Sequence, residues 1–223
     1  MERPFIGIVV PALNEATTIG DLIMQISRYG QAIVVDDGSI DATAKIAREA
    51  GADVVTHQVN QGYDDALNSG FSRAAELGCT YIITIDADGQ HNPAQLTQMI
   101  TLLTEGNELV LGIRDRFARI GETIFARCAN FLWGVPDPLC GMKGYATTLY
   151  SRAGCFDRYK LVGSELAVRS VVAGCRTAFM KIKVRDRDDA PRFGHLLLAN
   201  YRILRAMIIL MFMYPHRRRK VID

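Results

Sequence analysis

Asp86 and Asp88 are the two residues of this chain whose type and spacing most directly indicate chemistry. They follow the isoleucine-rich apolar run 81–85, which predicts a strand buried on both faces. Both carboxylates would point the same way at the carboxyl end of that strand, where open α/β sheets bind ligands. The pair predicts a site for a divalent cation that also binds a phosphate. The alternative is that the aspartates only cap the next helix, for which Asn92 and Pro93 mark a start.

A second acidic pair, Asp36 and Asp37, follows the apolar stretch 32–35. Acids at the end of a strand can accept hydrogen bonds from a nucleobase or a ribose hydroxyl. The alternative is a turn and a helix cap, for which Asp37-Gly38 and Asp41 suffice. The turn after the first strand lacks the G-x-G-x-x-G spacing, so a dinucleotide-binding Rossmann enzyme is not expected.

The composition is that of a globular protein, with 49% hydrophobic and 22% charged residues among 223. A net charge of +2 gives no case for a nucleic-acid partner. The five cysteines have no metal-binding spacing, and the N-terminus has no secretory pattern. We therefore expect reduced thiols and a cytoplasmic protein.

Predicted strands and helices alternate through the first half, which indicates α/β architecture with a mostly parallel sheet and helices on both faces. Strands are expected at 5–10, 32–35, 53–56, 81–85 and 108–113, and helices at 17–28, 41–50, 64–77 and 93–104. The later chain predicts a helix at 116–133, a loop at 134–144, a helix at 163–173, a strand at 178–184 and a long apolar helix at 195–213.

Four motifs, taken in order, carry a family resemblance: Val10-Pro11-Ala12-Leu13-Asn14-Glu15, Val34-Val35-Asp36-Asp37-Gly38-Ser39-Ile40-Asp41-Ala42-Thr43, Asn60-Gln61-Gly62 and Asp86-Ala87-Asp88-Gly89-Gln90. The chain resembles glycosyltransferase family 2, which has the GT-A fold, and within it the polyprenyl-phosphate sugar transferases such as dolichyl-phosphate mannosyltransferase. The resemblance spans about residues 5–195. It implies one catalytic domain, with a nucleotide-sugar half at 1–115, an acceptor half at 116–194, and a C-terminal helix and basic tail at 195–223.

The resemblance also implies a metal and donor site. Asp86, Asp88 and Gln90 match the positions that hold Mg²⁺ or Mn²⁺ against the donor diphosphate. Asp88 is also implied to be a catalytic residue. Base and ribose contacts are implied for a set of residues from the first two motifs: Pro11, Ala12, Asn14, Glu15 and Asp37, with Asp36 as the alternative to Asp37.

The segment after Gly62 departs from the family pattern, because Tyr63-Asp64-Asp65 stands where small or basic residues are usual. The two acids would either interact with the helix dipole or alter the donor contacts.

Basic residues are implied near the phosphates. Arg114 follows the strand at 108–113, and the loop Asp137-Pro138-Leu139-Cys140-Gly141-Met142-Lys143-Gly144-Tyr145 resembles the family pattern D-x-x-S-G-x-R-x-Y. Cys140 replaces the usual Ser, and Lys143 replaces the usual Arg, which keeps the charge but loses the bidentate geometry.

Glu165 matches the acidic position at which many members place a base. A hydroxyl acceptor needs such a base, whereas a lipid phosphate is already an anion, so an orienting or helix-start role is the alternative. Arg187 and Arg192 lie in a loop that resembles R-x-x-G-x-S-K/R, and are candidates for binding the donor diphosphate and the acceptor phosphate.

The apolar helix at 195–213 is followed by the cations Arg217-Arg218-Arg219-Lys220. This order fits a peripheral anchor at the anionic inner face of a membrane. The alternative is a helix packed on the core or in a homodimer interface. The apolar run 206–214 is too short to span a bilayer.

The predicted function is inverting, metal-dependent transfer of a sugar from a UDP- or GDP-linked donor to a polyprenyl phosphate. One alternative is the same fold acting on a saccharide or protein hydroxyl. The other is a non-catalytic, membrane-associated partner that holds a nucleotide sugar.

Overall fold

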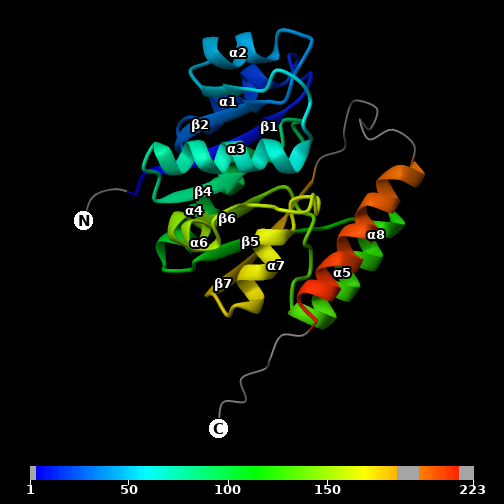
Figure 1. The fold of residues 1–223 in the computed structure, drawn as a ribbon. Helices are drawn as coiled ribbons and strands as arrows, with labels where there is room; N and C mark the ends of the chain where they lie inside the picture. Colours follow the sequence, from blue (N-terminus) through cyan, green and yellow to red (C-terminus); the bar gives the residue numbers. More distant parts are fainter. Residues whose placement is uncertain (1–3, 185–195, 216–223) are drawn as a thin grey trace.

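The computed structural model describes residues 4–184 and 196–215. Its centre is a seven-stranded sheet in the order β3-β2-β1-β4-β6-β5-β7 (Figure 1). The strands are β1 (Ile6–Ala12), β2 (Gln31–Asp36), β3 (Asp53–Thr56), β4 (Tyr81–Thr84), β5 (Leu109–Arg114), β6 (Lys143–Ala146) and β7 (Thr177–Ile182). The helices are α1 (Ile19–Ile26), α2 (Thr43–Glu49), α3 (Tyr63–Glu76), α4 (Leu96–Thr104) after a 3₁₀ turn (Pro93–Gln95), α5 (Ile120–Trp133), α6 (Thr147–Ala153), α7 (Glu165–Val172) and α8 (Leu196–Met213).

The sheet is mostly parallel, which confirms the predicted architecture. Strand β1 runs parallel to β2 and β4, β2 to β3, and β5 to β7, whereas β6 is antiparallel to both of its neighbours, β4 and β5. The carboxyl ends of β1, β2 and β4 therefore meet at one edge of the sheet, where ligands bind in such folds.

The prediction of a loop over 134–144 was wrong at its end, because β6 begins at Lys143, and α6 was not predicted. The sequence of β6 is Lys-Gly-Tyr-Ala, which has no apolar alternation. Gly144 is closely packed there: a Cβ at this position would lie 2.9 Å from Leu103 Cδ1 of α4. Tertiary packing, rather than local pattern, thus determines this strand.

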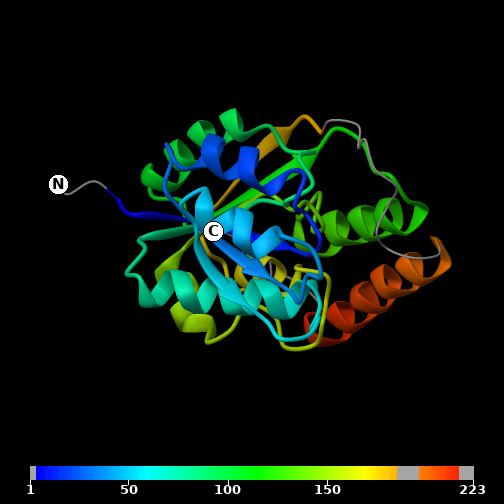
Figure 2. The same cartoon turned by 90° about the horizontal axis from the view of Figure 1, so that it is seen from above.

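Alternate residues of the inner strands β1, β2, β4 and β5 enter two separate cores. On β1, Val9 packs in the core under α3, α6 and α7, while Ile8 and Val10 pack in the core under α1 and α4. Figure 2 shows these helices on the two sides of the sheet. Burial on both faces explains why the strands read as continuous apolar runs.

Helices α5 and α8 form a parallel pair at one end of the molecule, side by side in both views (Figures 1 and 2). Near their N-termini, Gly121 N–H donates to Asn200 Oδ1 at 3.0 Å, and near their C-termini Trp133 Nε1 donates to the Tyr214 carbonyl at 2.7 Å. One side of α8 joins the core through Ile203, Ala206 and Leu210. Within residues 4–184 and 196–215, no helix is both long and apolar enough to cross a membrane.

Candidate active site

Asp86 lies just beyond β4, and three other segments hold its carboxylate in place. The Tyr63 hydroxyl at the start of α3 donates to Oδ1 at 3.0 Å, and His91 Nε2 lies 3.5 Å from Oδ2. Gly141 backs the same group so closely that a Cβ there would lie 1.9 Å from Asp86 Oδ2. The carboxylate is thus confined to one position.

Asp86 is held in its ionised form. Burial alone would raise its pKa, but the hydrogen bonds and charge of His91, the Tyr63 hydroxyl and the charge of Arg114 together hold the pKa below its usual value. An ionised, oriented carboxylate is the first ligand that a divalent cation needs.

Asp88 and Gln90 lie in the same turn as Asp86, where the Gln90 N–H donates to Asp88 Oδ1 at 3.1 Å. Both side chains are partly exposed. The described part of the chain has no preformed group of three His, Cys, Asp or Glu side chains around a cation position. Two carboxylates and an amide oxygen fit Mg²⁺ or Mn²⁺ as a partial shell that the oxygens of a bound diphosphate would complete.

Asp36 and Asp37 close the carboxyl end of β2, and both are buried. Asp37 Oδ1 lies 2.7 Å from His57 Nδ1 and accepts from the Gln61 N–H at 2.9 Å, while Oδ2 accepts from the Gly62 N–H at 2.8 Å. Asp37 thus ties the end of β2 to the start of α3. Its predicted contact with a base stays a prediction, as does that of Asp36, whose Oδ1 accepts from the Ser39 N–H at 3.3 Å.

The segment after β1 lies against the loop after β2. Asn14 has a left-handed backbone with φ 54°, and its Oδ1 accepts from the Ile40 N–H at 2.9 Å. The Glu15 N–H donates to Thr43 Oγ1 at 2.8 Å. Pro11 and Ala12 are paired with Val35 and Asp36 in the sheet. The structure therefore brings together the residues that were predicted to contact a nucleoside.

Arg114 is bound by carboxylates of the protein itself. Its Nε and Nη2 donate to Asp137 at 2.8 and 3.0 Å, and its Nη1 donates to Glu122 Oε2 at 3.1 Å. Both acids are buried, and the side chain of Arg114 is only 16% exposed. The expected phosphate contact of Arg114 stays a prediction, because this conformation already satisfies much of its guanidinium.

Lys143 is likewise internal, with its Nζ donating to the Gly163 carbonyl at 2.6 Å. Burial lowers the pKa of Lys143, and the negative charges of neighbours that include Asp137 and Asp86 partly offset this shift. Lys143 thus places positive charge behind Asp86, and its own contact with phosphate stays a prediction.

Glu165 begins α7 and is completely buried, at 0% exposure. Its Oε2 accepts from the Arg158 N–H at 2.7 Å, and its Oε1 lies 3.9 Å from Arg169 Nη1. In this conformation no acceptor hydroxyl can reach it, which agrees with the orienting alternative. Its catalytic role stays a prediction.

Asp64 and Asp65 lie in the first turn of α3, where acids favour the helix dipole. Asp64 also accepts hydrogen bonds from the Val162 and Gly163 amides, and Asp65 lies 2.8 Å from Lys160 Nζ. These acids therefore connect α3 to the loop before α7, a contact that neither sequence interpretation included.

Sequence reasoning missed Tyr63 and His91 as partners of Asp86. The signals available were the unusual tyrosine after Gly62 and a histidine directly after Gln90. Arg187 and Arg192 lie outside the described residues.

Residues 7–136 match the family model described as glycosyl transferase family 2. The chain belongs to this family. It is a glycosyltransferase, and its α/β structure is the GT-A fold.

Curated relatives match this chain over most of its length. An uncharacterized protein of Methanocaldococcus jannaschii is 30% identical over 92% of this chain and 91% of its own. A dolichyl-phosphate hexose transferase of Haloferax volcanii is 32% identical over 82% of this chain and 83% of its own.

Among solved structures, glucosyl-3-phosphoglycerate synthase from Mycobacterium tuberculosis, in complex with Mn²⁺, UDP and glucosyl-3-phosphoglycerate, has a TM-score of 0.76. It is 23% identical to this glycosyltransferase and covers 96% of this chain and 81% of its own. This likeness confirms the fold.

Proposed function

We propose that this glycosyltransferase transfers a sugar from a UDP- or GDP-linked donor to a polyprenyl phosphate, with inversion, at the inner face of a membrane. The observation that carries the proposal is the carboxylate of Asp86, which is ionised and fixed by Tyr63, His91 and Gly141 beside Asp88 and Gln90. The relative from Haloferax volcanii named as a dolichyl-phosphate hexose transferase supports the lipid acceptor.

Asp86, Asp88 and Gln90 would hold Mg²⁺ or Mn²⁺, which would offset the negative charge that builds on the departing nucleoside diphosphate. The metal-bound neighbour from Mycobacterium tuberculosis supports this choice of ion. Residues 11–15 and 36–37 would position the nucleoside, in the half formed by residues 1–115.

The proposed reaction is one displacement at the anomeric carbon. An oxygen of the acceptor phosphate forms the new bond as the bond to the donor diphosphate breaks, and the diphosphate leaves with the electron pair. The acceptor is already an anion near pH 7 and needs no base. The complete burial of Glu165 is consistent with such an acceptor and disfavours transfer to a hydroxyl.

The proposal is tested by incubating the full chain and Mn²⁺ with a panel of UDP- and GDP-sugars, with and without undecaprenyl phosphate. Nucleoside diphosphate release and the mass of the lipid product are measured. We expect release that requires the lipid, with a matching glycolipid. Release at the same rate with and without the lipid would contradict the lipid acceptor. No release with any donor would contradict the proposed transfer activity.

If the acceptor were a hydroxyl, Glu165 would be expected to act as the general base. If Glu165 were a general base, Glu165→Gln would remove the dependence of the rate on its ionisation. We expect the pH profile of lipid-dependent transfer to keep its shape in this variant. A profile that flattens in Glu165→Gln would favour the hydroxyl acceptor.

A further inference from the structure

The loop at 157–163, which precedes α7, packs against the tyrosine that orients Asp86. A Cβ at Gly163 would lie 3.0 Å from Tyr63 Cε1, so a side chain at this position would press on the ring. The Tyr63 hydroxyl in turn donates to Asp86 Oδ1 at 3.0 Å. The position of Gly163 therefore limits where the ring of Tyr63, and with it the donor to Asp86, can lie.

Gly163 also holds the buried cation near Asp86. Its carbonyl accepts from Lys143 Nζ at 2.6 Å. Burial lowers the pKa of Lys143, and the charge of Asp86 is among those that oppose this shift, so the two groups act on each other. One residue of the loop thus contacts both Tyr63 and Lys143, the two groups through which the loop can influence Asp86.

A buried carboxylate fixes this end of the loop. Asp64 Oδ2 accepts from the Val162 N–H at 3.3 Å, and Oδ1 accepts from the Gly163 N–H. Asp64 is only 8% exposed, and burying a carboxylate is costly unless hydrogen bonds compensate it. Val162 and Gly163 both have positive φ, which for a β-branched residue needs support from its surroundings. Asp64 supplies that support to the two amides next to Tyr63.

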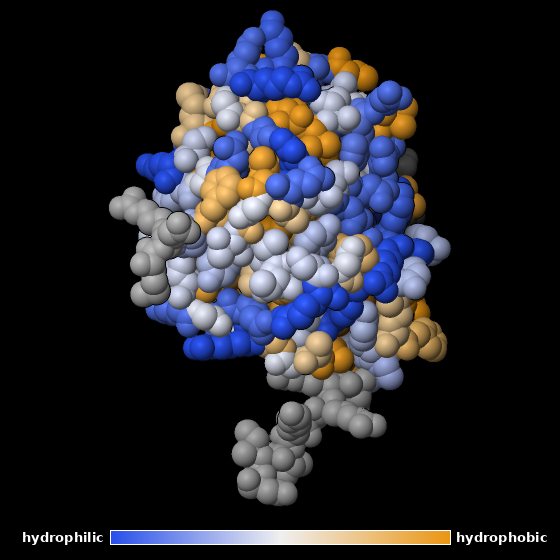
Figure 3. All heavy atoms as spheres, turned by 60° about the vertical axis from the view of Figure 1, so that its left-hand side comes forward, coloured by the Kyte–Doolittle hydropathy of each residue, from blue (hydrophilic) through white to orange (hydrophobic). Residues whose placement is uncertain are grey.

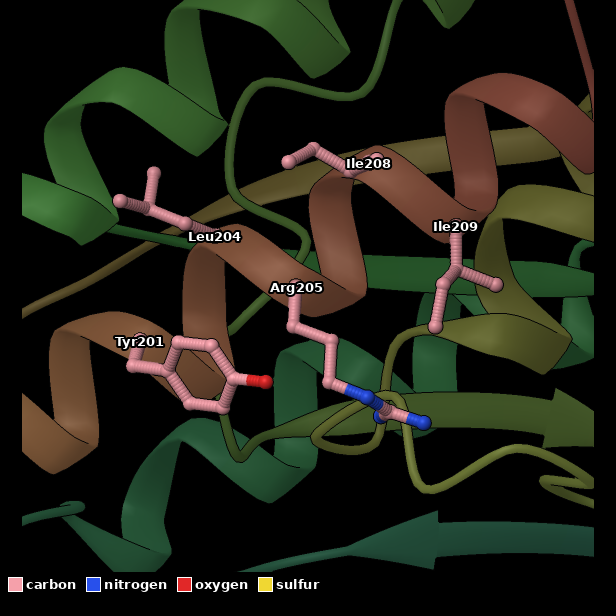
Figure 4. A pocket seen from close by; sticks show the side chains of 5 residues that line it. All are labelled: Tyr201, Leu204, Arg205, Ile208 and Ile209. Atoms are coloured by element: carbon pink, nitrogen blue, oxygen red, sulfur yellow. The ribbon is translucent and has the colours of Figure 1, made fainter.

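The middle of the loop is held by another element. Arg205 Nη1 of α8 donates to the Tyr159 and Lys160 carbonyls at 3.2 and 3.3 Å. Figure 4 shows Arg205 pointing to the side of α8 opposite Ile208. Helix α8 therefore holds residues 159 and 160, whereas Asp64 binds the end of the loop that contacts the site.

The neighbouring acid, Asp65, has a different environment. It pairs at 2.8 Å with Lys160 Nζ, and the side chains of Asp65 and Lys160 are 35% and 64% exposed. Figure 3 shows one side of the surface, where hydrophobic residues are scattered among hydrophilic ones, as is ordinary for a globular protein. An ion pair at an exposed position contributes little. Two acids in the first turn of α3 thus share the helix dipole but differ in what they hold.

We propose that Asp64 is a positioning residue for the metal site, acting through Gly163 on Tyr63 and Lys143 and through them on Asp86. By fixing the Gly163 amide, Asp64 fixes the ring that orients the metal ligand and the cation that lies behind it. This inference rests on the proposed function, whose metal position it assumes. It deepens that function by assigning a role to an acid outside the turn that would bind the ion.

The first test compares Asp64→Asn with Asp65→Asn. In Asp64→Asn, one of the two backbone N–H groups would meet an NH₂ group, which accepts no hydrogen bond. We expect this variant to weaken Mn²⁺ binding by about threefold or more, because Asp64 lies one contact further from the ion than Tyr63 does. Asp65→Asn should bind as the wild type does. Titration of Mn²⁺ by electron paramagnetic resonance, with UDP and in parallel with GDP, measures this without an acceptor or turnover.

The second test separates the contact with Tyr63 from backbone strain. Gly163→Ala and Gly154→Ala both place a side chain at positive φ, at 66° and 77°, but a Cβ at Gly154 would meet nothing within 4 Å. We expect Gly163→Ala to weaken Mn²⁺ binding and Gly154→Ala to leave it unchanged, with similar losses in thermal unfolding midpoint. In a Tyr63→Phe background, Gly163→Ala should have a smaller further effect, because the hydroxyl through which it acts is already absent.

Wild-type Mn²⁺ affinity in both Asp64→Asn and Gly163→Ala would overturn this inference. Equal losses in each variant and its control would do the same, since they would indicate general destabilisation. So would effects of Gly163→Ala and Tyr63→Phe that multiply in full. A wild type that binds no Mn²⁺ with either nucleotide would contradict the proposed metal site, and this inference with it. Failure of the lipid acceptor would leave all these affinities unchanged, so the two failures can be distinguished.

Discussion

Tyr63 illustrates how the site depends on single contacts. Its hydroxyl lies 3.0 Å from Asp86 Oδ1, and burial together with the charge of Asp86 raises the pKa of the phenol well above its usual value. Tyr63 therefore remains a neutral donor, and it orients the carboxylate without competing for it as a charged group would.

We predict that Tyr63→Phe weakens Mn²⁺ binding in the presence of UDP or GDP by about tenfold or more, because a partner that orients a metal ligand is lost. Titration of Mn²⁺ monitored by electron paramagnetic resonance measures this without turnover. Tyr201→Phe, on the exposed side of α8, is the control and should leave the affinity unchanged. An unaltered affinity in Tyr63→Phe would show that His91 and Gly141 suffice to hold Asp86.

The acidic residues of the site could be predicted from the sequence, whereas their partners could not. Asp86, Asp88 and Gln90 lie within five consecutive residues, so a local pattern reveals them. Tyr63 is 23 residues from Asp86, and Gly141 is distant in sequence too, so only the folded chain brings them together. Asp37 was predicted to face a ligand, and in the structure it binds the amides of Gln61 and Gly62.

At the level of elements, the loop before α7 has a strained backbone and contacts two buried acids. Lys160, Val162 and Gly163 all have positive φ, at 57°, 55° and 66°. This conformation is unfavourable for a β-branched residue such as Val162. The amides of the loop bind the carboxylates of Asp64 and Asp157, which hold it in this shape.

Asp157 makes the free energy of unfolding depend on pH. Burial, and then the charges of Asp64 and Glu165, raise the pKa of Asp157 from 3.8 to about 7. The folded protein therefore keeps a proton that the unfolded chain releases, so this group makes the free energy of unfolding fall as pH rises from about 4 to about 7.

We predict that Asp157→Asn removes this contribution, so that the free energy of unfolding depends less steeply on pH within that window. Urea unfolding at a series of pH values measures the slope. Asp21→Asn, at an exposed position on α1, should keep the wild-type slope. An Asp157→Asn slope equal to that of the wild type would contradict the assignment.

The elements up to β5 could be predicted because apolar strand segments alternate regularly with helical segments there, and their observed ends differ from prediction by a few residues. Strand β6 could not be predicted. Its four residues include Lys143 and Gly144, and its partners β4 and β5 precede it by more than twenty residues. The direction of a strand that is inserted between two earlier ones is decided by the sheet rather than by its own sequence.

For the whole molecule, α8 has one side in the core and other side chains exposed at the surface. Leu210 is fully buried against the core that contains Trp133, whereas Ile208, two residues earlier, is 48% exposed. The two sequence interpretations of this helix, core packing and a membrane surface, thus concern its opposite sides.

We predict that Leu210→Ala lowers the free energy of unfolding by about 2–5 kcal/mol, because it leaves a cavity between α8 and the core. Ile208→Ala is the matched control and should change it by less than about 1 kcal/mol. Denaturant unfolding of the two variants measures the difference. Equal, small costs would mean that α8 does not pack on the core as described.

The proposed sugar transfer to a lipid phosphate should depend on both Asp86 and Asp88. The most direct test is the rate of lipid-dependent nucleoside diphosphate release by wild type, Asp86→Asn and Asp88→Asn in the presence of Mn²⁺. We predict a fall of about a hundredfold or more in each variant, with thermal unfolding midpoints close to that of the wild type. Turnover that persists at the wild-type rate in both variants would show that these carboxylates do not support the transfer.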